Sequence, residues 1–196
     1  MRFRSWTAVA SSAAIVGLAF APSIFGAKPD RNISSGVTLT AAPVTAGPPG
    51  ITDSLAGKPI LKVSSSGLAV GKTLTGSVVI TNSSNAPLTV TVNQQNLATG
   101  PTEKPNLATW AQLTVQDSTA NKQIYSGSVA GFYTQPQTVC GIQVTRQSPC
   151  PKWNGSESHT FVFSLVIPNP PSGSSVNINT YQGTSLTTDF IWTSGT

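Results

Sequence analysis

The chain has 196 residues and a net charge of +5, and only 9% of its residues are charged, against roughly 25% in ordinary globular domains. The basic residues are scattered and do not alternate with aromatic residues, so the composition gives no support for a nucleic-acid-binding protein. Polar uncharged residues, Gly and Pro replace the charges. Together with many Val and Thr residues, this composition favours β-strands over helices.

Residues 1–27 have the pattern of a secretory signal peptide. Arg2 and Arg4 form a basic start, and the apolar stretch after them has a strongest part that is too short to cross a bilayer. Cleavage after Ala21 or after Ala27 fits the small-residue pattern, and an uncleaved anchor is the alternative. We therefore expect a protein that is secreted, extracellular or on the cell surface, with no membrane association in its mature form.

Residues 28–58 form a polar segment that is rich in Pro and Gly, and we predict a flexible N-terminal arm here. The arm contains one weakly alternating stretch with Ile33, Val37 and Leu39, which predicts a strand. A strand on a flexible tether can pair with its own domain or with the sheet edge of a neighbour. Residues 59–196 are predicted to form the folded domain.

The folded domain is predicted to consist of short strands separated by turn clusters. The expected strands are 60–63, 74–81, 88–92, 110–115, 123–126, 139–145, 159–167, 176–180 and 186–192. Strands 74–81 and 88–92 are expected to form an antiparallel pair joined by a polar turn. No segment after the signal peptide has a helical apolar stripe. The fold class is therefore all-β, with a single β-sandwich of jelly-roll or immunoglobulin-like type.

The stretch 159–167 has the strongest core pattern. Alternation places Phe161, Phe163, Leu165 and Ile167 on one face, with Val162 and Val166 on the other. Apolar residues on both faces indicate a central strand that is covered on both sides at least in part.

Two segments carry a resemblance to a known family. The stretch 179–192 has a Gln-Gly step, a Ser, an alternating run and an aromatic pair, and the stretch 68–82 has a Gly turn followed by Val-Ile-Thr-Asn. In this order they resemble the camelysin/TasA-like secreted proteins of biofilm-matrix fibres. Lys72 and Val70 depart from the Asp and Pro that are usual in that family.

The resemblance implies a non-enzymatic subunit of an extracellular matrix or surface fibre. Its partners would be further copies of the chain, in homopolymers, or other matrix components. Assembly would use an N-terminal strand, which here carries Ile33, Val37 and Leu39.

The chain shows no recognisable catalytic motif. His159 is the only histidine, and neither a His-Glu-x-x-His stretch nor a Gly-x-Ser-x-Gly elbow is present. A triad of His159, Asp189 and one of many serines would arise by chance, and His159 beside Glu157 is interpreted as a strand-edge residue. We therefore expect no catalytic residues, no metal and no cofactor.

The two cysteines, Cys140 and Cys150, are expected to form a disulfide, as a lone pair in an exported chain most simply does. Trp153 lies in the loop beside them and is the best candidate for a ligand contact, with packing over the disulfide as the alternative. A secreted carbohydrate- or surface-binding module is accordingly the alternative function. Trp192 alternates with Phe190 and is expected in the core.

Three Asn-x-Ser triplets, at Asn32, Asn82 and Asn154, match the glycosylation pattern. Such triplets carry glycans only in a host that glycosylates this pattern.

Overall fold

The computed structural model describes residues 34–41, 50–56, 58–62, 68–133, 137–142, 150–170, 172 and 177–195. The predicted signal peptide, Asn32 and Ile33 lie outside this part of the chain. Within it, no helix is long and apolar enough to cross a membrane.

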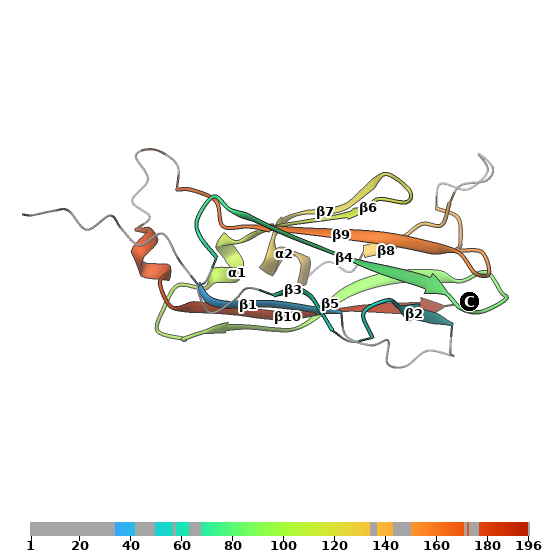
Figure 1. Ribbon diagram of the computed structural model, residues 1–196, viewed down its shortest axis with the longest axis horizontal. Helices are drawn as coiled ribbons and strands as arrows, with labels where there is room; N and C mark the ends of the chain where they lie inside the picture. Colours follow the sequence, from blue (N-terminus) through green and yellow to red (C-terminus); the bar gives the residue numbers. More distant parts are fainter. Residues whose placement is uncertain are drawn as a thin grey trace, which may run out of the picture.

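The chain folds into two five-stranded sheets that pack face to face (Figure 1). The first sheet has the order β3-β1-β10-β5-β8, with β3 (Pro59–Lys62), β1 (Ser34–Ala41), β10 (Thr184–Gly195), β5 (Thr89–Gly100) and β8 (Gln137–Val139). The second has the order β2-β4-β9-β6-β7, with β2 (Ile51–Asp53), β4 (Thr73–Asn82), β9 (Ser158–Val166), β6 (Gln112–Asp117) and β7 (Lys122–Ser128). The predicted all-β sandwich is confirmed.

Strand β9 is central, as its apolar pattern predicts, and it pairs with β4 on one side and β6 on the other. Its inward face carries Phe161, Phe163 and Leu165, all fully buried, while Val162 and Val166 on the outer face are partly buried. Trp192 and Phe190 on β10 face this strand across the core and contact its rings. Large apolar side chains from both sheets therefore fill the space between them.

The predicted hairpin of strands 74–81 and 88–92 is wrong. β4 lies in one sheet and β5 in the other, so the turn between them crosses from sheet to sheet. Both strands bury apolar residues, Val78 and Ile80 on β4 and Val90 and Val92 on β5. We call this turn, residues 83–88, the arch. It lets the apolar faces of both strands point into the same core, and each strand pairs with other strands in its own sheet.

Asn82 holds this arch together. Its side chain is fully buried, and its Nδ2 atom lies 2.8–3.2 Å from the carbonyl oxygens of Ala86, Trp153 and Asn154. Its Oδ1 atom accepts hydrogen bonds from the backbone N–H and the hydroxyl of Ser84. The amide nitrogen is thus occupied and enclosed, so the glycosylation triplet at Asn82 is not available in the folded protein.

We expect Asn82→Ala to lower the free energy of unfolding by about 2–3 kcal/mol, because it leaves buried carbonyl groups without donors. Urea denaturation of the purified domain measures this value. Asn85→Ala is the matched control, since Asn85 is exposed in the same turn. Equal losses in the two variants would show that the buried amide does not organise the arch.

The described part of the chain contains three short helices where strands or irregular segments were expected: α1 (Leu107–Trp110), α2 (Val129–Tyr133) and the 3-10 helix η1 (Ile178–Tyr181). Asn106 and Asn177 explain two of them, because each accepts a hydrogen bond from the backbone N–H two residues later and so caps a helix. Strand β6 therefore begins at Gln112 rather than at Trp110. Residues 178–180 of the expected strand 176–180 belong to η1 instead.

Strand β5 extends to Gly100, well past the predicted end at Val92, and carries Gln94 into the core. The Gln94 side chain is 1% exposed, and neither its Oε1 nor its Nε2 atom has a hydrogen-bond partner among the described residues. A buried amide without partners costs more free energy than an apolar group of the same shape.

Gln94→Met is therefore expected to raise the free energy of unfolding by about 1–2 kcal/mol, because methionine keeps the length of the side chain and removes the unpaired polar atoms. Thermal unfolding compares it with Gln95→Met, a substitution at the exposed neighbouring position. A destabilised Gln94→Met variant would mean that the amide has a partner in solution.

Candidate functional site

The predicted assembly strand lies inside the sheet of its own chain. β1 pairs in parallel with β10, from Ser34 opposite Thr184 to Ala41 opposite Phe190. Its other edge pairs in antiparallel fashion with β3, where Leu39 lies opposite Leu61. Of the two outcomes that the sequence left open for this strand, the structure shows pairing within the domain.

Val37 and Leu39, the two described assembly residues, lie opposite Leu186 and Thr188 of β10, respectively. The predicted domain boundary at residue 59 is too late, because β1 and β2 both precede it and belong to the two sheets. The sequence 42–50 joins these strands from one sheet to the other. These nine residues could span at most ~30 Å when fully extended.

β1 is the first described strand of the chain, and it lies inside its sheet rather than at an edge. It lies between β3 and β10, and it is connected to the rest of the chain at its C-terminal end by the segment 42–50. Both of its edges are used, so a sheet that loses β1 exposes unpaired backbone groups on β3 and on β10. The two exposed edges would form an acceptor for one strand.

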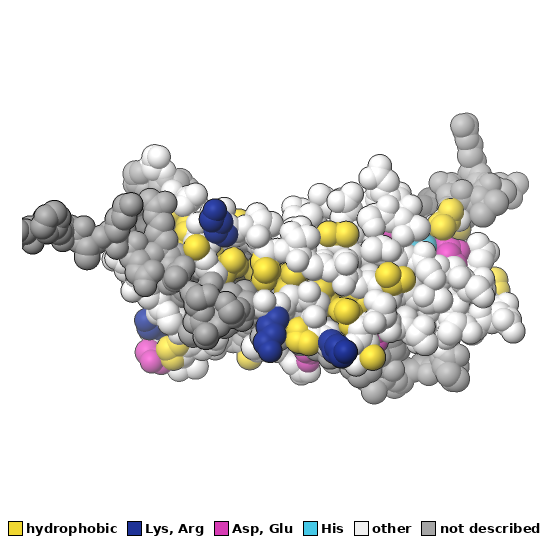
Figure 2. Space-filling view, viewed as in Figure 1, with side chains coloured by type: hydrophobic (Ala, Val, Ile, Leu, Met, Phe, Trp, Pro, Cys, Tyr) yellow, Lys and Arg dark blue, Asp and Glu magenta, His cyan; other side chains and the backbone are white. Residues whose placement is uncertain are grey.

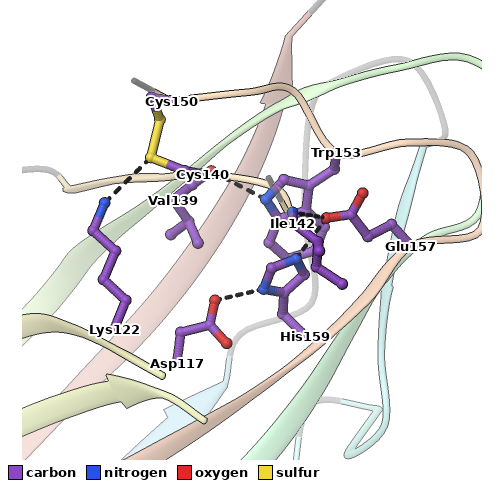
Figure 3. Close-up of a disulfide and its surroundings, with 9 residues drawn as sticks. All are labelled: Asp117, Lys122, Val139, Cys140, Ile142, Cys150, Trp153, Glu157 and His159. Atoms are coloured by element: carbon purple, nitrogen blue, oxygen red, sulfur yellow. Dashed lines mark hydrogen bonds and ion pairs between the residues drawn. A yellow bond between two sulfur atoms is a disulfide. The ribbon is translucent and has the colours of Figure 1, made fainter. Parts of the chain in front are cut away.

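A second feature, which we call the disulfide corner, consists of Cys140, Cys150, Trp153, Glu157, His159 and Asp117 (Figure 3). The predicted disulfide between Cys140 and Cys150 is confirmed. In the chain-entropy account, a loop of this length stabilises the folded state by about 2–3 kcal/mol.

Trp153 is fully buried, so its indole is not available for the ligand contact that the sequence suggested. The ring stacks on the His159 imidazole, with 4.1 Å between the ring centroids, and its Nε1 atom donates a hydrogen bond to the Val139 carbonyl at 3.0 Å. A backbone bridge to Leu88 fixes the residue further. Trp153 therefore serves as a packing residue that joins the disulfide segment to the core.

His159 is fully buried on the central strand β9, so its interpretation as a strand-edge residue is wrong. Its Nδ1 atom lies 2.5 Å from the Asp117 Oδ2 atom, and its Nε2 atom lies 2.8 Å from the Glu157 Oε1 atom (Figure 3). Two of the six acidic residues in the sequence thus meet the only histidine. Three of the few ionisable side chains in this sequence therefore lie together in one buried cluster.

The cluster favours the doubly protonated imidazole, since both ring nitrogens face carboxylates and only the imidazolium can donate to both. Burial on its own would lower the pKa of His159, but the hydrogen bonds to Asp117 and Glu157 outweigh it and raise the pKa above its usual value. Burial would raise the pKa of Glu157, but bonds from His159 and from the backbone N–H groups of Ile142 and Asn154 lower it.

This arrangement leaves His159 without a nitrogen that could activate a nucleophile. Asp189, the other acid considered for a triad, lies on β10 in the opposite sheet, where its carboxylate accepts a hydrogen bond from Asn96. The structure therefore does not bring His159 and Asp189 together. In the described part of the chain, no group of three His, Cys, Asp or Glu residues is arranged to hold a metal ion.

Sequence reasoning missed Asp117 and Glu157 as partners of His159, although a signal was present. Glu157 and His159 continue the two-residue period of Phe161 and Phe163, and this period places both on the buried face. Asp117 continues the alternation of β6 in the same way.

Comparison with known proteins gives little further information. No family model matches the chain, and no curated protein sequence matches it. Among solved structures, the chain is similar to the N-terminal domain of PorA, with 10% sequence identity over 82% of this chain and 88% of that chain and a TM-score of 0.26. A similarity of this size carries no conclusion about function.

Proposed function

We propose that this protein is a non-enzymatic structural subunit of an extracellular matrix or surface fibre, and that it assembles by exchange of strand β1. The observation that carries the proposal is the pairing of β1 on both edges, with β3 and with β10. The signal-peptide pattern and the camelysin/TasA-like resemblance support the extracellular part.

Exchange preserves the contacts that β1 makes within its own domain. A β1 strand from a neighbouring copy would meet the same edges of β3 and β10 in the same register, so the main-chain hydrogen bonds would be replaced one for one. The contact is head-to-tail, because the donor strand and the acceptor edges are different parts of the chain. Contacts of this kind extend into fibres when the rotation from one copy to the next does not close a ring, and the proposal takes this open arrangement.

The surface is compatible with close approach between copies. Figure 2 shows mostly uncharged side chains on the visible face, with few Lys, Arg, Asp or Glu residues. Few charges mean weak repulsion between neighbouring subunits. The engagement of both His159 nitrogens supports the non-enzymatic part of the proposal.

Electron microscopy of two purified chains tests the proposal. The chain that begins at Lys28 is expected to form filaments at micromolar concentration, and the chain that begins at Gly50, which lacks β1 but keeps β2, is expected to form none. Equal filament formation by the two chains would exclude β1 as the donor.

The alternative function is a carbohydrate- or surface-binding module. Trp153, its best candidate for ligand contact, does not support it because the side chain is buried. For the same experiment, the binding-module alternative predicts that the chain from Lys28 forms no filaments. A chain from Lys28 that stays monomeric under all assembly conditions and binds glycans would replace the fibre proposal with this one.

A further inference from the structure

The disulfide lies beside a surface cavity of about 310 Å³. The wall includes Cys140, Ile142 and Lys122, together with Thr119 and Ala120 from the turn between β6 and β7. Cys150 is exposed and Cys140 is half-buried. Solvent therefore reaches Cys140 through the cavity and reaches Cys150 at the surface.

The described residues place a cation beside one of the two sulfur atoms. The Lys122 ammonium donates a hydrogen bond to the Cys140 Sγ atom at 3.3 Å (Figure 3). A positive charge at this distance would stabilise the Cys140 thiolate and make it the better leaving group when the S–S bond is cleaved. Lys122 therefore favours Cys140 as the leaving sulfur atom.

Hydrogen bonds fix the chain segments next to both cysteines. The Gly141 N–H donates to the Pro151 carbonyl at 2.8 Å, and the Ile142 N–H donates to the Glu157 carboxylate at 2.5 Å. Trp153 binds the carbonyl of Val139, the residue before Cys140. The two cysteines therefore stay close together when the S–S bond is open, and the bond can form again.

We propose that Cys140–Cys150 is a reversible thiol-exchange site for low-molecular-weight thiols, with Cys150 as the attacked sulfur and Cys140 as the leaving group. This inference does not depend on the fibre proposal. It assigns the disulfide corner a chemical reactivity in addition to its structural role.

The exchange proceeds in two balanced steps. A thiolate RS⁻ attacks the Cys150 Sγ atom, the S–S bond breaks, and its electron pair moves to the Cys140 Sγ atom, which leaves as a thiolate beside Lys122. The product is a mixed disulfide between R and Cys150. A second RS⁻ then attacks the R sulfur, releases RSSR and leaves the Cys150 thiolate, so two electrons have passed from the thiol to the protein.

The test measures the second-order rate constant for reaction of the folded protein with glutathione, in the wild type and in Lys122→Met. We expect the variant to react about threefold more slowly, the change that follows when the pKa of the leaving thiol rises by about one unit with a Brønsted sensitivity of about 0.5. Lys122→Arg should react like the wild type. Lys152→Met, which changes an exposed lysine next to Pro151, should also leave the rate unchanged.

Peptide mass mapping of the first product should find glutathione on Cys150 and a free thiol on Cys140. Cysteamine, whose amine is positively charged, separates the leaving-group effect from attraction of an anionic thiol, because Lys122→Met should slow its reaction as well. Equal rates in wild type and Lys122→Met, faster reaction of the variant with cysteamine, or glutathione on Cys140 would each overturn the proposal. A near-ultraviolet circular dichroism signal that does not return after reoxidation would also overturn it, because the site would not be reversible.

Discussion

A chain that begins at Gly50 is expected to lose most of its stability, and a synthetic peptide of residues 32–42 should restore it. Deletion of β1 leaves the edges of β3 and β10 without partners, and we expect the free energy of unfolding to fall by roughly 5 kcal/mol or more, a large share of the total for a domain of this size. Thermal unfolding followed by circular dichroism measures the loss and the recovery.

The control for this experiment is a peptide of the same composition in scrambled order, which should not raise the melting temperature. The peptide experiment is independent of filament formation, because it asks only whether the sheet accepts β1 as a separate strand. If the chain from Gly50 melts at the wild-type temperature, β1 contributes nothing to the sheet and exchange has no driving force.

His159→Leu is expected to lower the free energy of unfolding by about 3–5 kcal/mol at pH 6. The substitution leaves the carboxylates of Asp117 and Glu157 buried without their cation, which is the costly way to break a buried ion cluster. Denaturant titration measures the loss. The triple variant with Asp117→Asn and Glu157→Gln should regain part of the stability, because the unpaired charges are removed. An unchanged stability of His159→Leu would contradict the ion cluster.

The same cluster predicts how stability depends on pH. The raised pKa of His159 gives a contribution that is complete below the ordinary value of 6.5 and is lost as the pH rises through the folded pKa. The lowered pKa of Glu157 gives a contribution that is present above 4.5 and is lost as the pH falls through the folded pKa. The contribution of the cluster is therefore greatest between pH 4.5 and 6.5.

Melting temperatures recorded from about pH 3 to about pH 9 should show this maximum in the wild type, and the triple variant should show a flatter profile. A wild-type melting temperature that keeps rising above pH 7 would mean that His159 is neutral in the folded protein.

Much of the fold could be predicted from alternation, which reports how a strand is buried on each face. The central position of β9 followed from apolar residues on both of its faces, and the core position of Trp192 followed from its spacing with Phe190. The pairing of β4 with β9 rather than with β5 could not be read in this way. Alternation specifies which face of a strand is buried but not which sheet the strand joins.

Local capping and buried polar residues account for the other differences. Asn106 and Asn177 start short helices through side-chain hydrogen bonds; the helix after Asn177 replaces a strand that alternation had predicted, and the helix after Asn106 lies in a segment without a predicted strand up to Trp110. For the candidate site, the disulfide could be predicted from the sequence. The cluster around His159 could be predicted only in part: alternation places Glu157 and His159 on the same face, but only the pairing of β6 with β9 brings Asp117 to them.

The most direct measurement of strand exchange is a covalent trap in assembled protein. Thr38 lies opposite Thr187 in the β1–β10 register, and Thr187 is exposed. A chain with Thr38→Cys and Thr187→Cys is assembled, oxidised and separated by denaturing electrophoresis under non-reducing conditions, and a chain with Thr38→Cys and Thr193→Cys serves as the out-of-register control. Exchange of β1 predicts a ladder of cross-linked multimers that collapses to monomer on reduction and is absent from the control. Filaments that yield only monomers, with the two introduced cysteines bonded to each other inside one chain, would show that β1 stays in its own chain and would contradict the assembly mechanism.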